Sequence, residues 1–189
     1  MKLQRTLPPA AAPIYINDIT HGIGALFCGN RGREQFRNEL KRHFGVKYCF
    51  LVSSGKAALY CILKSLQKLH PDRDEVLIPA FNCYSVPSAI VKAGCSIRLC
   101  DIDPDTLDFN KEQLAEELSD SKRLLCVIPT HLFGLEADVG SVCRLINDES
   151  VFVVEDAAQS MGNGSPEAWS GLSGDVGFFS LGRGKSFSA

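Results

Sequence analysis

The 189-residue sequence lacks an excess of charge of either sign and lacks any long hydrophobic run. With 20 Lys and Arg against 22 Asp and Glu, its net charge of -2 offers no basic footprint for nucleic acid. No apolar stretch is long enough to cross a bilayer, and the opening MKLQRTLPPAAAPIYIND contains no signal-peptide core. We therefore expect a globular cytoplasmic protein that binds neither nucleic acid nor a membrane.

The eight cysteines lack the spacing of a metal site. No Cys-x-x-Cys pair occurs, so nothing indicates a zinc clip. Most of the cysteines lie in apolar runs such as YCFLV, YCILKSL and LLCVIP, where a free Cys behaves as a small buried hydrophobe. We predict buried reduced thiols in place of disulfides or a metal site, with Cys83 as the exception.

Two nucleotide-binding motifs are present only in part. Gly184 to Ser186 matches the end of a P-loop, but Phe179 stands where its first glycine should be, and the helix that should follow is absent. Gly22 and Gly24 begin a dinucleotide fingerprint, yet Phe27 replaces its third glycine. The sequence therefore argues against a P-loop kinase and against a dehydrogenase of the Rossmann type.

Short apolar runs alternate with helical patterns along the chain after a Pro- and Ala-rich arm, residues 1–20. Strands that are apolar on both faces indicate a largely parallel sheet with helices on both sides, so the fold class is α/β. We expect one domain over residues 21–189. The predicted strands are 47–54, 75–80, 96–103, 123–130, 151–156 and 175–181, and the predicted helices are 32–44, 55–69, 85–94, 111–120 and 138–148.

Polar residues follow the predicted strands, where open α/β sheets bind their ligands. The helix start at 53–56 offers free amides and hydroxyls to an anion. Asp156 ends a buried strand and needs a compensating partner, and Lys185 adds an amine. Taken singly, these features also fit a helix cap, a core ion pair and a surface lysine. Together they are what pyridoxal 5′-phosphate (PLP) requires for its phosphate, ring nitrogen and aldehyde.

Six segments resemble, in order and spacing, the DegT family of PLP-dependent sugar aminotransferases of fold type I. The resemblance runs from about residue 20 to the end of the sequence, and six ordered matches are far more specific than one short motif. The segments are SSGKAAL, DEVLIPAFNCYSVPSAIVKAGC, DIDPDTLDFNKEQL, THLFGLEADV, VFVVEDAAQSMG and GDVGFFSLGRGKSFSA.

The resemblance implies a role for four residues in the second half of the chain. Lys185 matches the catalytic lysine that bonds covalently to the cofactor aldehyde. Ser180 matches a phosphate ligand, and Asp156 matches the carboxylate paired with the ring nitrogen. Gln159 matches the glutamine beside the cofactor ring and its phenolic oxygen.

In the first half the sequence departs from the family pattern. Gly55 and Lys56 match a Gly-Thr pair whose amides hold the phosphate, so the resemblance implies a backbone contact without the hydroxyl. Cys83 stands where many members stack an aromatic ring on the cofactor, and Tyr84 lies one residue away. His131 lies at a strand end near the expected site, where a structural role is also open.

The resemblance also implies an activity and an assembly. We expect amino transfer from an amino acid, glutamate or glutamine, to the keto group of a nucleotide-linked sugar, for cell-surface polysaccharide or related biosynthesis, by a homodimer. Family members continue well past the lysine, so we expect an incomplete cofactor-binding domain without the small C-terminal domain, inactive alone. The alternatives are a non-catalytic binding or regulatory protein, and sugar dehydration on the same cofactor, for which relatives replace the lysine with histidine.

Overall fold

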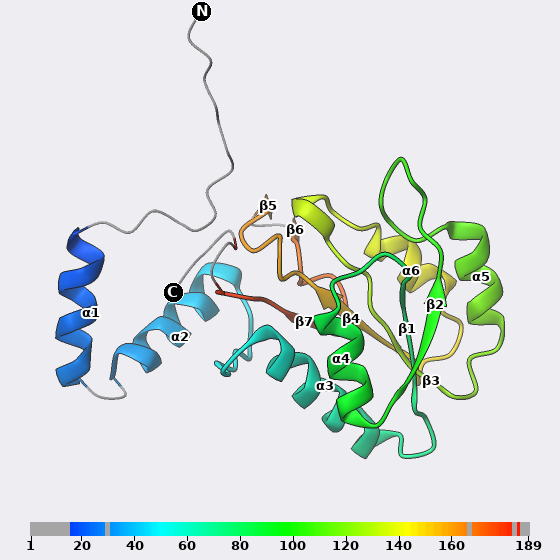
Figure 1. Cartoon of the computed structure of the whole chain (residues 1–189), viewed down its shortest axis with the longest axis horizontal. Helices are drawn as coiled ribbons and strands as arrows, with labels where there is room; N and C mark the ends of the chain where they lie inside the picture. Colours follow the sequence, from blue (N-terminus) through cyan, green and yellow to red (C-terminus); the bar gives the residue numbers. More distant parts are fainter. Residues whose placement is uncertain (1–15, 29–30, 166–167, 183–184, 186–189) are drawn as a thin grey trace, which may run out of the picture.

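The protein was analysed as a computed structural model that describes residues 16–28, 31–165, 168–182 and 185. Its main sheet has five strands, and a short hairpin lies beside it (Figure 1). The strands are β1 (Glu75–Pro79), β2 (Ser96–Cys100), β3 (Leu124–Val127), β4 (Phe152–Asp156) and β7 (Val176–Phe178), with β5 (Gly164–Ser165) and β6 (Ala168–Trp169) in the hairpin. The helices are α1 (Ile16–Cys28), α2 (Arg31–Phe44), α3 (Gly55–Leu69), α4 (Ser85–Ala93), α5 (Lys111–Ser119), α6 (Val139–Leu145) and the 3-10 turn η1 (Leu132–Gly134).

Every strand pair of the main sheet is parallel, in the order β2-β1-β3-β4-β7. The predicted α/β class with a largely parallel sheet is therefore confirmed. From β1 the chain moves to one side to form β2, and it then crosses to the other side to form β3. The order of the strands thus reverses between β1 and β3, and ligands of open α/β sheets bind at such a point.

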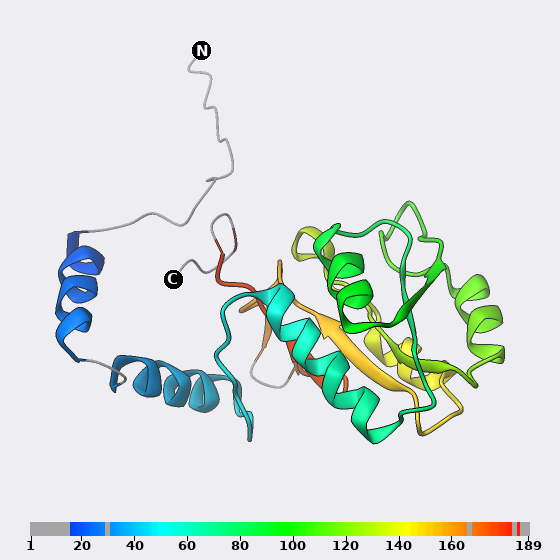
Figure 2. The ribbon, with the colours of Figure 1, turned by 60° about the horizontal axis from the view of Figure 1, so that its bottom comes forward.

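Helices cover both faces of the sheet, as Figures 1 and 2 show from two sides. Alternate strand residues supply the two cores because successive side chains of a strand point to opposite faces. Under α3 and α4 the core contains Leu59, Leu63, Val76, Ile78, Ile90 and Val154. Under α5 and α6 it contains Leu77, Leu114, Val127, Val142 and Val153.

The predicted end of α4 is confirmed in detail. Gly94 follows the helix with φ 80°, a left-handed conformation that glycine adopts without strain. Its N–H donates to the carbonyls of Ile90 and Val91. The chain can therefore turn directly from α4 into β2.

The predicted strand at 47–54 is wrong. This segment belongs to no strand of the described structure, and two of its aromatic residues, Tyr48 and Phe50, are 67% and 82% exposed. Its continuous apolar run is typical of a buried strand, but a strand forms only where a neighbour accepts its ladder of hydrogen bonds. Among the described residues no such neighbour is present.

Helix α1 was not expected from the sequence. Residues 16–20, which we assigned to an arm without regular structure, form its first turns. In both ribbon views α1 stands apart from the sheet, with α2 between them (Figures 1 and 2). The remainder of the predicted arm lies outside the described residues. No described helix is long and apolar enough to cross a membrane.

The seven cysteines whose side chains the structure describes are free thiols. Cys95, Cys100 and Cys126 are buried, as predicted. Cys61 and Cys143 are exposed instead. Cys61 lies in an apolar run, but α3 buries Leu59 and Leu63 and turns the residue between them outward.

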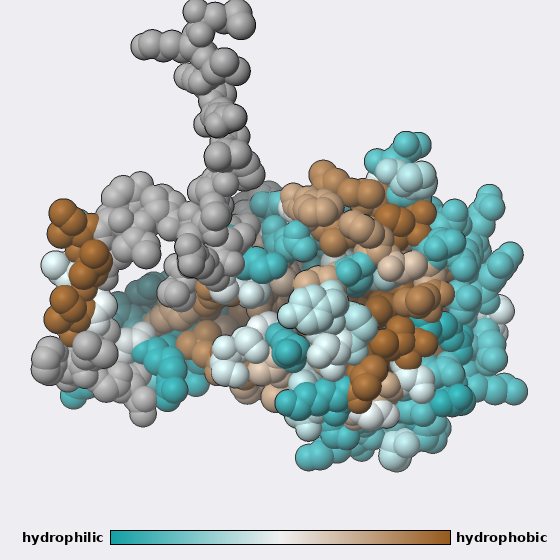
Figure 3. All heavy atoms as spheres, viewed as in Figure 1, coloured by the Kyte–Doolittle hydropathy of each residue, from teal (hydrophilic) through white to brown (hydrophobic). Residues whose placement is uncertain are grey.

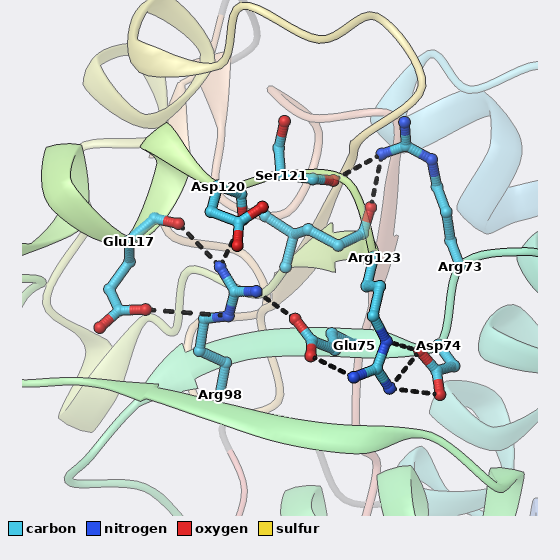
Figure 4. A network of polar contacts seen from close by, with 9 residues as sticks. Arg73, Asp74, Glu75, Arg98, Glu117, Asp120, Ser121 and Arg123 are labelled. Atoms are coloured by element: carbon cyan, nitrogen blue, oxygen red, sulfur yellow. Dashed lines mark hydrogen bonds and ion pairs between the residues drawn. The ribbon is translucent and has the colours of Figure 1, made fainter.

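Three arginines hold the amino ends of the strands together (Figure 4). Arg98 of β2 pairs with the carboxylate of Glu75 on β1 and donates to the backbone carbonyls of Glu117 and Asp120 at the end of α5. Arg123 forms a bidentate pair with Asp74, in which Nε and Nη2 donate to the carboxylate at 2.8–3.0 Å. Arg73 donates to the backbone carbonyls of Ser121 and Leu124 and to the carboxylate of Asp148, at 2.7–2.9 Å. This edge of the sheet is therefore a satisfied network of charges.

Candidate active site

The start of α3 lies against the residues that follow β7. Ser54 caps the helix, because its Oγ accepts from the backbone N–H of Ala57 at 3.1 Å. Within the described structure, the N–H groups of Gly55 and Lys56 have no acceptor, as is usual for the first turn of a helix. A Cβ at Gly55 would lie 3.3 Å from the carbonyl oxygen of Phe179 and 3.5 Å from Cβ of Ser180.

This contact fits the predicted phosphate cradle. Two N–H donors at a helix start and the hydroxyl of Ser180 come together, and a helix N-terminus attracts anions. The hydroxyl of Ser54 already caps α3, so the backbone N–H groups are left to make the predicted contact with the anion. The side chain of Lys56 is exposed.

Asp156, the last residue of β4, is 5% exposed. Its Oδ1 accepts from the N–H of Ala158 at 3.0 Å, and no described residue donates to its Oδ2. Burial raises the pKa of this carboxyl, while the Ala158 hydrogen bond and the charge of Lys185 oppose the rise. A buried carboxylate with so little compensation is suited to a cationic donor such as a protonated ring nitrogen.

Lys185 lies in the turn that follows β7. Its N–H donates to the carbonyl of Gly182 at 3.1 Å, and its side chain is half-buried. Asp156 lies opposite Phe178 in the register of β4 and β7, so the turn that carries Lys185 leaves the sheet beside Asp156. The charge of Lys185 lowers the pKa of both Asp156 and Cys83. Ser180 begins the same turn, and its Oγ accepts from the N–H of Gly182 at 3.4 Å.

The 3-10 turn η1 orients Gln159. The N–H of Phe133 donates to Oε1 of Gln159 at 3.1 Å. Phe133 has φ 55°, which is uncommon for a residue with a side chain. Because the oxygen of the amide accepts this bond, the nitrogen at its other end is the donor that a phenolic oxygen would need. Sequence reasoning named Gln159 but not the turn that holds it.

The loop after β1 is fixed to the loop after β3, where the strand order reverses. Asn82 Nδ2 donates to Oγ1 of Thr130 at 3.1 Å. Cys83 follows Asn82, whereas Tyr84 points into solvent with 80% of its surface exposed. Of these two candidates for the stacking position, Cys83 has a thiol whose pKa is shifted by the charges of Lys185 and Asp156.

His131 forms a buried pair with Glu155, a residue that sequence reasoning passed over. His131 Nε2 lies 3.0 Å from Oε2 of Glu155, and its Nδ1 accepts from the N–H of Ala137 at 3.1 Å. His131 is therefore the neutral tautomer with its proton on Nε2. Both side chains are at most 2% exposed.

Glu155 also holds the loop before β7. Its carboxylate accepts from the N–H groups of Gly171 at 3.0 Å and of Ser173 and Gly174 at 2.5 Å. Burial alone would raise the pKa of Glu155, but the bonds from His131 and these amides hold that pKa below its usual value. Glu155 points to the face opposite Asp156. The two consecutive acidic residues at the end of this strand could have indicated the role of Glu155 from the sequence, because each buried carboxylate needs its own hydrogen-bond donors.

A hollow of about 410 Å³ lies outside this cluster. Its lining includes Asp103, Asp108, Glu112, Glu136 and Asp138, and none of the predicted site residues. The candidate site is instead an open edge where α3, α4, β4 and β7 meet. The chemistry of the candidate site therefore follows from the side chains and backbone groups at this edge.

Comparison with known proteins connects this edge to a family. The family model of the DegT/DnrJ/EryC1/StrS aminotransferases matches residues 20–189. The chain belongs to this family. The resemblance found in the sequence motifs is thereby confirmed, and DegT-family aminotransferases are PLP-dependent.

Individual relatives are distant and longer. GDP-perosamine synthase of Vibrio cholerae is 26% identical over 169 residues, which cover 88% of this chain and 44% of the relative. A UDP-N-acetyl-3-dehydro-alpha-D-glucosamine 3-aminotransferase of Acidithiobacillus ferrooxidans is 29% identical over 179 residues, covering 92% of this chain and 47% of the relative. The chain thus spans about half the length of the curated relatives it matches.

A solved structure supports the same fold. The Escherichia coli GDP-4-keto-6-deoxy-D-mannose-3-dehydratase with bound hydrated PLP superposes with a TM-score of 0.79 at 21% identity. The match covers 95% of this chain and 48% of the dehydratase. At that identity the likeness establishes the fold of this DegT-family chain, and its activity and substrate need separate argument.

Proposed function

We propose that this protein is a PLP-dependent aminotransferase that acts on a nucleotide-linked sugar. The observation that carries the proposal is the convergence of the α3 start, Asp156 and Lys185 at one edge of the sheet. Each feature alone has an ordinary structural explanation, but together they match the needs of one cofactor. Family membership supports the same assignment.

Each site residue has its own proposed role toward the cofactor. When bound, PLP supplies an electron-accepting ring to the reaction. The amides of Gly55 and Lys56 and the hydroxyl of Ser180 would hold its phosphate, and Asp156 would keep the ring nitrogen protonated. Lys185 would hold the aldehyde, and its amine would take and return the proton at the reacting carbon. Gln159 would orient the phenolic oxygen.

The substrates are part of the proposal. Relatives named for GDP- and UDP-linked sugars support a nucleotide sugar as the amino acceptor. Glutamate or glutamine is the proposed donor, and a relative from Streptomyces fradiae is named as an L-glutamine-dependent aminotransferase. Dehydratases are also among the relatives, but the primary amine of Lys185 favours amino transfer.

We further propose that residues 21–189 form part of a cofactor-binding domain that works as a homodimer in the cytoplasm. Helix α1 supports a dimer, because Ile16, Ile19 and Ile23 share one face and are 79%, 54% and 55% exposed. Hydrophobic side chains are visible along α1 in the space-filling view (Figure 3). Light scattering would test the assembly, and Ile19→Glu should shift a dimer toward monomer.

Titration of the chain with PLP tests the cofactor assignment. We expect a visible absorbance band from the covalent bond to Lys185, and we expect Lys185→Ala to lose it. Lys122→Ala, which changes an exposed lysine far along the chain from the site, should keep the band. An identical spectrum in wild type and Lys185→Ala would refute the role of Lys185.

Addition of glutamate separates an enzyme from a binding protein. An aminotransferase should convert the cofactor to its amino form and lose the visible band in one half-reaction. A band that persists with glutamate and with glutamine would favour the non-catalytic binding protein, since the site would then hold the cofactor without reacting.

A further inference from the structure

Cys83 stands at the border between the β1 loop and α4, and its backbone is fixed on both sides. Its N–H donates to Oδ1 of Asn82 at 2.6 Å, and its carbonyl accepts from the N–H of Val86 at 3.0 Å. The side chain itself is exposed. The thiol is therefore held in place and remains open to reagents.

The surroundings of this thiol differ from those of the other cysteines. Ser85 Oγ donates to Sγ of Cys83 at 3.1 Å. This bond lowers the pKa of the Cys83 thiol, with help from Lys185 and against Asp156. Burial instead raises the pKa of Cys95 and Cys143. A partly exposed thiol beside a donor and a cation is the setting of a reactive cysteine.

Cys83 is connected to the candidate cofactor site through its neighbour Asn82, which donates to Thr130, the residue paired with Asp156 in an isolated parallel bridge. Asp156 is nine-tenths or more buried and has one oxygen to which no described residue donates. Lys185 lies in the turn after β7, the strand that pairs with β4. An adduct on Cys83 would thus extend into space that the candidate cofactor must occupy.

We propose that Cys83 is a thiol-modification site at which a mixed disulfide and the cofactor exclude one another. This inference rests on the proposed function. The Cys83 thiolate attacks one sulfur of a low-molecular-weight disulfide, and a new S–S bond forms to Cys83. The original S–S bond breaks, its second sulfur leaves as a thiolate, and the proton of Cys83 passes to solvent. No other oxidant is needed.

A labelling experiment on the full chain tests the reactivity of the thiol. Glutathione disulfide is added at neutral pH, and the modified peptides are quantified over time by mass spectrometry. We expect Cys83 to react about tenfold or more faster than Cys143, an exposed thiol whose pKa is raised by burial and by the charges of Asp175 and Glu155. Ser85→Ala should slow Cys83 and leave Cys143 unchanged. Equal rates at Cys83 and Cys143 would overturn the proposal.

A second arm tests the exclusion. Saturating PLP should slow labelling of Cys83 about tenfold and leave Cys143 unaffected, and glutathione disulfide should abolish the visible PLP band until dithiothreitol restores it. Cys143→Ser should respond as the wild type does. In Cys83→Ser the band should be insensitive to the disulfide, measured against its own untreated sample.

The outcomes separate this inference from the proposed function. If PLP gives the Lys185-dependent band but does not protect Cys83, the proposed function stands and the exclusion is wrong. The exclusion is also wrong if the disulfide removes the band in Cys83→Ser. If PLP gives no band, the proposed function and the exclusion both fail, while the labelling rates still decide whether Cys83 is a reactive thiol.

Discussion

The two edges of the sheet use the same kinds of charged residue in opposite ways. At the amino edge, Arg98 and Arg123 meet Glu75 and Asp74, and the donors of Arg98 also reach backbone carbonyls (Figure 4). At the carboxyl edge, Asp156 has one hydrogen bond from a backbone amide and a nearby lysine. A contribution to stability fully explains the arginine network at the amino edge. It does not explain why Asp156 is buried with so few donors.

The same contrast divides neighbouring residues of β4. Glu155 accepts from His131 and three backbone amides, whereas Asp156 accepts from one amide. Burial raises the pKa of Asp156, and the hydrogen bonds of Glu155 keep its own pKa low. A charged group whose partners are all present is a structural group, and one that lacks them is a candidate for function.

The largest expected effect comes from breaking the satisfied member of this pair. Glu155→Gln leaves one oxygen to face four N–H donors, so at least two of them must face the new NH₂ group. We expect a loss of about 3–5 kcal/mol in the free energy of unfolding. Urea denaturation measures it, and Glu149→Gln, on an exposed glutamate, should change stability little.

The pH dependence of that loss checks its electrostatic origin. The folded pKa of Glu155 lies below the unfolded value, so its contribution is present above the unfolded pKa and is lost as the pH falls through the folded one. The difference between wild type and Glu155→Gln should therefore begin to shrink below about pH 4. A difference that is constant down to pH 2 would point to packing instead.

Asp156→Asn should weaken cofactor binding without lowering stability, in contrast to Glu155→Gln. The raised pKa means that burial disfavours the charged form, so the neutral amide should leave stability at neutral pH unchanged or higher. PLP affinity should fall about 10- to 100-fold, because a charged hydrogen bond to the ring nitrogen is lost. Equilibrium titration with PLP, beside urea denaturation of the same sample, measures both. Lower stability with unchanged affinity would make Asp156 a structural residue.

Arg98→Met should affect stability alone. The substitution keeps an apolar stem and removes the donors to Glu75 and to the carbonyls of Glu117 and Asp120. We expect a loss of about 1–2 kcal/mol, since these groups are only partly exposed. PLP affinity per folded molecule should stay the same, and a change in it would mean that the two edges are coupled.

Two glycine substitutions give the smallest effects. Gly32→Ala, in α2 with open space around its Cβ, should stabilise the protein by about 0.5–1 kcal/mol through helix propensity. Gly55→Ala should lose that gain, because its Cβ would lie 3.3 Å from the carbonyl oxygen of Phe179. It should also weaken PLP binding, and an unchanged affinity would argue against a phosphate held at α3.

Much of the site could be located from the sequence because strand ends are local features. The run before Asp156 and the small residues at 53–55 placed both at the ligand-binding edge, and the structure brings them to one side of the sheet. What the pattern could not supply was the partner of each group. The hydroxyl of Ser54 is occupied as a cap, and Gln159 is held by η1.

The sequence by itself determined the α/β class, the order of helices α2 to α6 and the edge of the sheet that we propose as the site, because periodicity and chain order are local. Only the tertiary structure decided that the apolar segment 47–54 forms no described strand and that Cys61 is exposed. It alone separated Glu155, a buried anchor, from Asp156, a buried carboxylate to whose Oδ2 no described residue donates. These outcomes depend on contacts between segments far apart in the chain, where the ladder partner or hydrogen-bond donor is present or absent.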